Sequence, residues 1–583
     1  MKIKNSKILS CIVLLAVLLA SCSSADIDSV KIVCTSDVHG HFFPYDYLHD
    51  KSSSGSLARV SSYLNELRSS TAYGDNVIYI DNGDILQGQP TAYYSNTVDV
   101  GNTHLAADVL NYLKCDVAML GNHDIETGGS TYQRYLEDLD CKAVVGNILY
   151  EDTDYPFLPP YVLIERGGLQ IAFLGLTTPA IPNWLPRSLW KGLQFADMEQ
   201  SAQRWMKHLH DHANPDLVIG LFHSGYEGGI VTDECVENAT RAVAEFVPGF
   251  DAIFYGHDHR ARCEKIVNVE GDTVLLINPA NNANKVATLD VKRVKVVGRE
   301  ELVLTADLVD MNTYEVDVKY LETFATKHQE VQDYVSRRIG TLTDSISSRD
   351  AYFGPSPFID FIHQMQLAVS GAQISFVAPL TFDTTLAKGD VYVRDMFNLY
   401  RYENMLYVMR LKGYEIKTYL EMSYSLWTNQ MTSANDHLLL FDEVESIADA
   451  NASRMKHLVY NFDSAAGILY EVDVTQPTGE KIAIKSLADG KPFDMNGVYL
   501  VALNSYRGNG GGELLTKGAG IPHDELARRV EYSTEIDLRF YMLNYIEMAG
   551  TISPKALNHW KFVPESWAIS AAERDRRLLF GDE

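Results

Sequence analysis

The sequence predicts an α/β protein with two domains. Its 583 residues are too many for one ordinary hydrophobic core. From Val30 to about Asp310, short runs rich in Val, Ile and Leu alternate with segments of helical spacing, which is typical of buried strands in an α/β domain. A similar alternation returns from about Thr341 to Phe562. The composition, 46% hydrophobic and 10% aromatic, is that of a globular protein.

In the first domain, apolar spacing predicts helices over residues 56–69, 103–113 and 198–212. After Glu264 the pattern changes to alternation of apolar and polar residues, which predicts a meander of antiparallel strands that closes the domain, with residues 293–297 as a strand of their own. The apolar runs expected to form buried strands begin at Ile32, Val77, Val117, Val144, Ile171, Leu217 and Ala252.

Residues 314–340 are more polar and are interpreted as an interdomain linker with a helix over residues 321–337. In the second domain, residues 356–370 and 414–427 have helical spacing. Residues 498–503 are expected to form a strand that ends in a glycine-rich turn. Residues 563–583 are charged and are expected to be a terminal tail, either helical or disordered.

The N-terminus has the features of a targeting segment. Three lysines precede an apolar stretch that is too short for a membrane span, so residues 1–21 are interpreted as a signal peptide and 22–29 as a linker. Leu19-Ala20-Ser21-Cys22 resembles a bacterial lipobox, in which the Cys is lipidated; the alternative is an ordinary signal peptide with an incidental Cys. We therefore expect an exported protein, anchored to a bacterial membrane through Cys22 alone, on the periplasmic or the cell-surface side.

The formal net charge of −27 argues against binding to a nucleic-acid polymer. Small anionic substrates remain possible because bound divalent cations can invert the local field. Of the seven cysteines, five follow Cys22, without CxxC spacing, and none resembles a metal ligand. A Cys115–Cys141 or a Cys235–Cys263 bridge is compatible with an oxidising compartment.

Five loops that follow apolar runs carry the same residue types: carboxylate, imidazole and carboxamide. A lone His of this kind is usually an ordinary core or surface residue, but five such loops in order indicate a metal site. These ligands suit Mn²⁺, Fe²⁺, Co²⁺, Zn²⁺ or Mg²⁺, and they are numerous enough for two ions if a carboxylate, most naturally Asp84, bridges them. The candidate ligands are Asp37, His39, Asp84, Asn122, His223, His257 and His259.

The five loops together resemble the calcineurin-like metallophosphoesterases, in their 5′-nucleotidase branch. The resemblance implies an N-terminal β-sandwich flanked by helices, at residues 30–313, and a C-terminal α/β substrate-binding domain, at residues 341–562. The matching blocks are Ser36-Asp37-Val38-His39-Gly40, Asn82-Gly83-Asp84, Gly121-Asn122-His123-Asp124, His223-Ser224-Gly225-Tyr226-Glu227 and Gly256-His257-Asp258-His259.

The resemblance also implies roles for these residues. One ion would take Asp37, His39, Asp84 and His259, and the other would take Asp84, Asn122, His223 and His257. His123 would contact the phosphoryl group, with Asp124 as the residue that orients it. The expected reaction is hydrolysis of a nucleotide phosphoester by a water that two divalent metal ions activate.

In the second domain, two motifs resemble those with which this branch holds a nucleotide base between two aromatic rings. Tyr402 and Tyr506 are the expected stacking pair, and stacking of this kind tolerates any base. For a lone Tyr, a core position would be the simpler interpretation. The expected substrate-binding residues are Tyr402, Asn404, Asn504, Tyr506, Arg507 and Gly508.

The chain departs from the pattern of many 5′-nucleotidases at Ala378–Thr384, where an Asn-Gly-Gly-x-Arg block is expected and no Arg occurs. An arginine that grips a monophosphate is therefore in doubt, and the second half is similar to the 2′,3′-cyclic-nucleotide 2′-phosphodiesterase/3′-nucleotidase members. The alternatives are thus a 5′-nucleotidase, which releases nucleoside and phosphate, a cyclic-nucleotide phosphodiesterase/3′-nucleotidase, or a non-catalytic nucleotide-binding surface lipoprotein.

Overall fold

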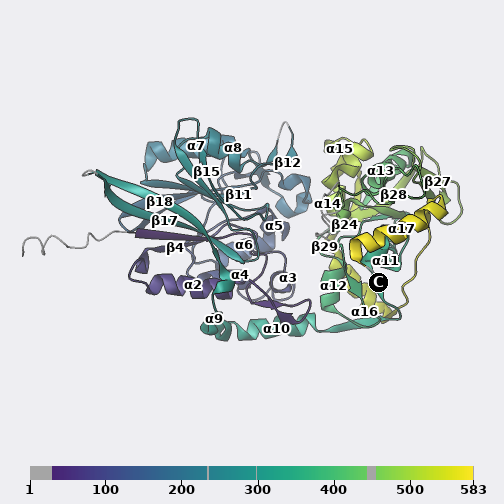
Figure 1. The fold of residues 1–583 in the computed structure, drawn as a ribbon, viewed down its shortest axis with the longest axis horizontal. Coiled ribbons are helices and arrows are strands. Elements are labelled where there is room, and N and C mark those ends of the chain that lie inside the picture. Colours follow the sequence, from purple (N-terminus) through teal and green to yellow (C-terminus); the bar gives the residue numbers. More distant parts are fainter. Residues whose placement is uncertain (1–28, 233–234, 297–298, 443–454, 582–583) are drawn as a thin grey trace, which may run out of the picture.

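The computed structural model describes residues 29–232, 235–296, 299–442 and 455–581. The predicted signal peptide, the lipidation site Cys22 and the linker up to residue 28 lie outside the described residues. The described chain forms two domains, which lie side by side and are joined by α9 (Val318–Thr323) and α10 (Ala325–Val335) (Figure 1). Within these ranges no helix is both long and apolar enough to cross a membrane.

Two six-stranded sheets form the first domain. The first runs in the order β18 (Arg299–Asp310), β17 (Lys285–Val296), β1 (Ser29–Thr35), β4 (Val77–Asp81), β5 (Val117–Ala118), β6 (Lys142–Ala143). The second runs in the order β15 (Arg262–Val267), β16 (Thr273–Asn278), β14 (Ala252–Tyr255), β11 (Leu217–His223), β9 (Leu169–Thr177), β8 (Tyr161–Arg166).

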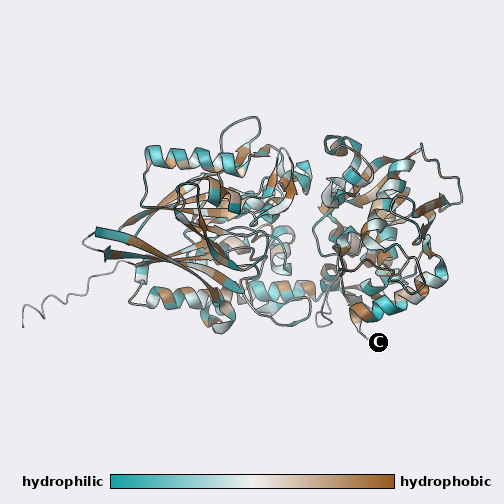
Figure 2. Ribbon diagram, turned by 45° about the horizontal axis from the view of Figure 1, so that its top comes forward, coloured by the Kyte–Doolittle hydropathy of each residue, from teal (hydrophilic) through white to brown (hydrophobic). Residues whose placement is uncertain are grey.

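The two sheets pack face to face over one hydrophobic core. Ile32 and Ile80 of the first sheet and Phe173 and Phe254 of the second belong to the same buried cluster. Helices α2 (Leu57–Ser69) and α4 (Leu105–Tyr112) pack on the outer side of the first sheet, and α7 (Met198–His212) and α8 (Thr240–Phe246) on that of the second. The helices at the outside are largely hydrophilic, and hydrophobic residues gather on the strands (Figure 2). The predicted β-sandwich flanked by helices is confirmed.

The predicted meander after Glu264 is wrong. Strand β16 runs parallel to β14, and the hairpin of β15 and β16 extends the second sheet. Strand β17 pairs with β1 in the first sheet and runs unbroken to Val296, so residues 293–296 are not a separate strand. Alternation of apolar and polar residues specifies a strand and its buried face, but it does not specify the neighbouring strand.

The second domain is built on a five-stranded sheet covered by α11 (Pro357–Ser370) and α13 (Gly413–Trp427). The segment expected as a tail is helix α17 (Glu565–Phe580), which buries Ala571 and Leu579 in the core of this domain. The five cysteines that the structure describes are free thiols. The order of the sheet is β25 (Ser464–Ala466), β21 (Ile374–Val377), β28 (Val498–Asn504), β24 (Met405–Lys412), β29 (Val530–Asp537).

The domains meet through short helices. On the first domain these are α3 (Pro90–Thr97) and α5 (Asn122–Glu126), and on the second they are α12 (Val393–Leu399) and α14 (Ser505–Gly508) (Figure 1). Helix α5 follows β5 and carries the Gly-Asn-His-Asp motif, and α14 follows β28 and carries Tyr506. The two motifs that the sequence singles out therefore face each other across the interface.

Candidate active site

The carboxyl ends of β1, β4, β5, β11 and β14 bring the five predicted loops together at one edge of the sandwich. Two groups of side chains have ligand atoms that lie within 4.8 Å of one another in each group. They adjoin, because Nε2 of His223 lies 3.8 Å from Oδ1 of Asp37. The groups are Asp37, His39 and His259, and Asp84, His223 and His257.

The loops hold these side chains in an uncommon backbone conformation. Asp37, His39, Asp84, His257 and His259 all have φ between 49° and 73°, the left-handed region that few residues other than glycine adopt. Backbone hydrogen bonds fix this geometry: Asp37 N donates to Gly83 O at 3.0 Å and His39 N to Asp84 O at 2.9 Å. Five such residues in one site indicate a functional constraint.

Only glycine fits at position 121, because any side chain there would clash with its neighbours. A Cβ there would lie 2.2 Å from Oδ1 of Asp84 and 2.7 Å from Nε2 of His223. The backbone of the Gly-Asn-His-Asp loop therefore passes directly against two candidate ligands.

Hydrogen bonds assign the tautomers of three imidazoles. Nδ1 of His223 donates to the carbonyl of Asn82 at 2.8 Å, and Nδ1 of His39 donates to that of Gln87 at 3.0 Å. Nε2 of His257 donates to Glu237 at 3.0 Å. Burial lowers the pKa of His39 to about 4, so this imidazole is neutral at neutral pH. Nε2 of His39, Nε2 of His223 and Nδ1 of His257 are thus the nitrogens that face the site, as in metal-binding histidines. For His223, burial disfavours the imidazolium, but the carboxylates of Asp84 and Asp37 outweigh burial and raise its pKa to about 10.

Two buried atoms at the centre of the site have no hydrogen-bond partner among the described residues. Nε2 of His223 and Oδ2 of Asp84 are buried 3.0 Å apart, and neither has a hydrogen-bond partner among the described residues. Nε2 of His39 lies 3.1 Å from Nε2 of His259. Carboxylate oxygens and imidazole nitrogens that gather this closely in a buried place are suited to bind cations, and buried polar atoms are otherwise satisfied. The residues therefore fit two divalent cations. Oδ1 of Asn122, 2.8 Å from Nδ1 of His257, is a further candidate ligand atom.

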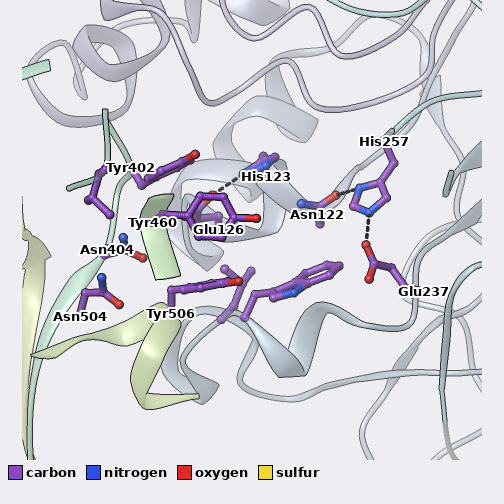
Figure 3. A pocket seen from close by; sticks show the side chains of 13 residues that line it. Asn122, His123, Glu126, Glu237, His257, Tyr402, Asn404, Tyr460, Asn504 and Tyr506 are labelled. Atoms are coloured by element: carbon purple, nitrogen blue, oxygen red, sulfur yellow. Dashed lines mark hydrogen bonds and ion pairs between the residues drawn. The ribbon is translucent and has the colours of Figure 1, made fainter. Parts of the chain in front are cut away.

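His123 is oriented by Glu126. Both lie on α5, and Nδ1 of His123 is 2.5 Å from Oε2 of Glu126 (Figure 3). Burial disfavours the imidazolium, but the carboxylates of Asp84 and Glu126 outweigh burial and raise the pKa of His123 to about 9. Glu126 is not a candidate ligand, so its effect on His123 persists when cations neutralise Asp84.

The expectation that Asp124 orients His123 is wrong. Its carboxylate is fully buried and accepts hydrogen bonds from four backbone N–H groups at 2.7–3.0 Å, which exhausts its capacity as an acceptor. Asp124 therefore fixes the loop of Asp84 against the loop of His123. The four donors are Gly121, Asp84, Ile85 and Leu86.

A pocket between the domains leads to His123. The rings of Tyr402 and Tyr506 are each nearly perpendicular to that of Tyr460, at 84° and 88°. Figure 3 shows them on either side of Tyr460. The two predicted aromatic residues thus form the sides of a clamp, and Tyr460 forms its back wall. The residues that line the pocket are Asn122, His123, Glu126, Trp184, Leu185, Glu237, His257, Leu380, Tyr402, Asn404, Tyr460, Asn504 and Tyr506.

Two predicted substrate-binding residues do not face this pocket. The guanidinium of Arg507 is buried, forms an ion pair of 2.7 Å with Asp463 and donates to the carbonyls of Gly511 and Tyr460. A Cβ at Gly508 would lie 2.4 Å from the ring of Tyr407, so this glycine serves packing. Arg507 satisfies a buried carboxylate, and it supports the turn behind Tyr506.

Six of the residues that line the pocket were not predicted as site residues: Glu126, Trp184, Leu185, Glu237, Leu380 and Tyr460. Glu126 could have been found from the sequence, because residues three apart on a helix, such as His123 and Glu126, lie side by side. Glu237, Trp184 and Tyr460 had no such signal, because they reach the pocket from segments distant in the sequence. Glu237 lies beside His257, and the ring of Trp184 is 5.7 Å from that of His257.

Comparison with known proteins agrees with this architecture. Residues 30–261 match the family model of the calcineurin-like phosphoesterases, and residues 338–517 match that of the 5′-nucleotidase C-terminal domain. The trifunctional nucleotide phosphoesterase protein YfkN of Bacillus subtilis is 26% identical over 92% of this chain, but the matched region spans only 39% of YfkN. A 2′,3′-cyclic-nucleotide 2′-phosphodiesterase/3′-nucleotidase of Haemophilus influenzae is 26% identical over 93% of this chain and 88% of that protein.

Solved structures show the same fold. A Staphylococcus aureus protein in complex with alpha-ketoglutarate has a TM-score of 0.74 and 21% identity, over 92% of this chain and 99% of that one. The 5′-nucleotidase precursor from Thermus thermophilus has a TM-score of 0.60 and 19% identity, over 92% and 100%. With its calcineurin-like domain, its 5′-nucleotidase C-terminal domain and two groups of candidate metal ligands, this chain belongs to the 5′-nucleotidase family of metallophosphoesterases, which are metal-dependent hydrolases.

Proposed function

We propose that this enzyme hydrolyses 2′,3′-cyclic nucleotides and 3′-nucleotides, with the base between Tyr402 and Tyr506 and the phosphoester at the metal-ligand loops. The observation that supports this most is the charge of the pocket. None of the described residues that line it is Lys or Arg, whereas Glu126 and Glu237 are carboxylates. Leu380, within the segment that lacks the expected Arg, lines the pocket instead.

A pocket of this charge favours substrates with little negative charge outside the metal centre. A cyclic phosphodiester carries a single negative charge. A polyphosphate would place further charges near the two carboxylates without a cation among the described lining residues to balance them. The side chains that line the pocket therefore disfavour polyphosphates as substrates.

Residues of the two domains have different roles in the proposed reaction. The two ligand groups would hold divalent cations, which would supply activation of a water and stabilisation of the charge on the phosphoryl oxygens. His123, held by Glu126, donates a charge-assisted hydrogen bond to the phosphoryl or leaving oxygen. Asn404 and Asn504 offer carboxamides beside the tyrosines; Oδ1 of Asn504 accepts from Arg507 N at 2.8 Å, which leaves its NH₂ group as a donor.

A 5′-nucleotidase is the second candidate, favoured by the structural likeness to the Thermus thermophilus protein. The curated relatives differ in how much of this chain they match. The Haemophilus influenzae cyclic-nucleotide enzyme matches 93% of it, and a 5′-nucleotidase of Vibrio cholerae matches 40%. This difference supports the cyclic-nucleotide and 3′-nucleotide assignment.

The test is release of inorganic phosphate and nucleoside from AMP, 3′-AMP and 2′,3′-cyclic AMP, offered side by side with Mn²⁺, Co²⁺ or Zn²⁺. Asp84→Ala and His123→Ala are the inactive controls. We expect turnover of the cyclic and 3′ substrates to exceed that of AMP. Faster turnover of AMP would establish the 5′-nucleotidase instead. Lack of turnover by a protein that binds two ions would exclude nucleotides as its substrates.

Anchoring through Cys22 stays a prediction from the sequence. We propose that Cys22→Ala moves the protein from the membrane fraction to the soluble fraction of cells without changing its nucleotidase activity. An unchanged membrane fraction would argue for another mode of attachment.

A further inference from the structure

A buried group of charged and aromatic side chains joins the two domains behind the nucleotide clamp. Tyr93 belongs to α3 of the catalytic domain, but its side chain packs into a hydrophobic cluster of the second domain. There it contacts Phe397, Asp537 and Arg539, all of which are buried. We call Tyr93, Glu403, Asp537 and Arg539 the interdomain cluster.

Each member of the interdomain cluster contacts at least one other member. The hydroxyl of Tyr93 donates to Oδ2 of Asp537 at 3.1 Å. The guanidinium of Arg539 lies over the ring of Tyr93, 4.7 Å from its centroid, and over that of Phe397, at 4.4 Å. Its Nη2 atom forms an ion pair with Glu403 at 2.8 Å. A planar guanidinium can stack on two rings and meet a carboxylate at the same time, which an ammonium cannot.

On the side of the second domain, the cluster fixes the clamp. Glu403 stands between Tyr402 and Asn404, both of which line the pocket. The N–H of Leu538, between Asp537 and Arg539, donates to the carbonyl of Asn404 at 2.8 Å. The conformation of the clamp loop therefore depends on the ion pair and on this backbone bond.

On the side of the first domain, the cluster is tied to the metal-ligand loops. Helix α3, which carries Tyr93, begins six residues after Asp84. The N–H of Gln89, its N-cap, donates to the carbonyl of His39 at 2.9 Å, and the side chain of Asn96 donates to the carbonyl of Leu86 at 2.7 Å. Tyr93 thus has a short, hydrogen-bonded connection to two candidate ligands.

We propose that Arg539 is a positioning residue that sets the spacing between the nucleotide clamp and the metal-ligand loops, and so determines which phosphate of a nucleotide reaches them. This inference rests on the proposed function. With the base held by Tyr402 and Tyr506, a 5′-phosphate and a 2′,3′-phosphate lie at different distances and directions from the base. One fixed spacing can serve only one of these positions well.

The experiment compares Arg539→Lys and Tyr93→Phe with the wild-type enzyme on 2′,3′-cyclic AMP, AMP and bis-p-nitrophenyl phosphate. The aryl substrate has no base and needs no clamp. We expect kcat/KM for cyclic AMP to fall about tenfold or more in Arg539→Lys, because misplacement by about 1 Å has effects of this size. The ratio of kcat/KM for cyclic AMP to that for AMP should decrease in this variant. Its turnover of the aryl diester should stay within about twofold of the wild-type value. Tyr93→Phe should change the same quantities in the same direction.

Tyr320→Phe is the matched control, because Tyr320, on α9, is also buried in the core of the first domain and donates one hydrogen bond, to the carbonyl of Phe42 at 3.0 Å. It should leave all three substrates unaffected. If Arg539→Lys does not fold, Tyr93→Phe carries the test, because it keeps the ring and removes only the hydroxyl. An equal decrease of kcat/KM for all three substrates, or unchanged kcat/KM in both variants, would overturn the inference. Failure of the wild-type enzyme to hydrolyse any nucleotide would instead refute the proposed function.

Discussion

His123 and Glu126 lie one turn apart on α5, and Nδ1 of His123 is 2.5 Å from Oε2 of Glu126. The histidine lines the pocket, and the carboxylate lies outside both groups of candidate ligands. Glu126 can therefore hold His123 in one orientation and stabilise its imidazolium without giving up charge to a metal ion. Asp124, the neighbour of His123 in the sequence, is occupied by backbone N–H groups.

Glu126→Gln should lower kcat by about 10²-fold, because a positioned acid contributes about 10²–10⁴-fold and His123 would lose its ionic partner. The amide keeps the shape of the side chain, so the content of bound metal and the thermal midpoint should stay as in the wild-type enzyme. Steady-state kinetics and metal analysis of the purified variant check this. Unchanged kcat would show that His123 needs no partner.

Asp124→Ala should act on stability and metal binding. It leaves four backbone N–H groups without their acceptor in a buried site, and each unsatisfied donor costs about 1–3 kcal/mol. We expect the free energy of unfolding to fall by at least about 3 kcal/mol in urea melts, together with loss of bound metal. In Asp216→Ala, which removes an acceptor of a single backbone N–H, stability should change little.

The gathering of the candidate metal ligands at one edge could be predicted from the sequence, because each loop follows a buried strand and carries its candidate ligands within a few residues of the strand end. His257 and His259 show this: both join the site, and the intervening Asp258 accepts from Tyr226 N at 3.0 Å. The carboxylate partner of His123 was misassigned, because adjacency in the sequence says nothing of which side of a helix a residue occupies.

The second domain was less predictable. Tyr402 and Tyr506 occur in recognisable motifs, but Arg507 and Gly508 in the same motif face the protein core. Tyr460 reaches the pocket from a segment with no motif, and the partners of β16 and β17 are set by tertiary pairing. Local patterns give the elements, and contacts between distant segments determine which side chains meet.

Removal of metal should abolish activity and lower stability together. Cations that bind only the folded protein stabilise it by about 2.7 kcal/mol at a hundredfold excess over Kd. After treatment with EDTA we expect a lower thermal midpoint, restored together with activity by Mn²⁺, Co²⁺ or Zn²⁺. Asp84→Asn should bind fewer ions than the wild-type protein, and the control Asp258→Asn, from the loop of His257 and His259, should bind as many. Equal metal content in both variants would contradict the prediction that Asp84 binds both ions.

Substitutions in the aromatic clamp should change the binding of nucleotides only. Stacking of a base on an aromatic ring is worth about 1–3 kcal/mol, so Tyr506→Ala or Tyr402→Ala should raise KM for a nucleotide between about fivefold and 150-fold. Turnover of bis-p-nitrophenyl phosphate should not change. Tyr506→Phe, which keeps the ring, should retain most of the affinity. A similar loss on the aryl diester would place these rings near the metal centre.

Acid should destabilise the second domain through His363. This side chain is fully buried between the hydroxyls of Ser375 and Ser464, at 2.9 Å and 3.2 Å. Burial lowers its pKa to about 3, whereas an unfolded chain has a histidine pKa of about 6.5. Between these values the unfolded state binds the proton and the folded state does not. The free energy of unfolding should therefore fall as the pH decreases from about 6.5 to 3, by about 1.4 kcal/mol per pH unit from this residue.

In His363→Gln this contribution disappears. The variant should be less stable than the wild-type protein at pH 7, because its packing changes, but its loss of stability between pH 6 and pH 4 should be shallower by about one proton. Urea melts at several pH values in EDTA measure the two slopes without a contribution from metal binding. If the slope of His363→Gln equals that of the wild-type protein, His363 is protonated in the folded state and the two serines accept its hydrogen bonds.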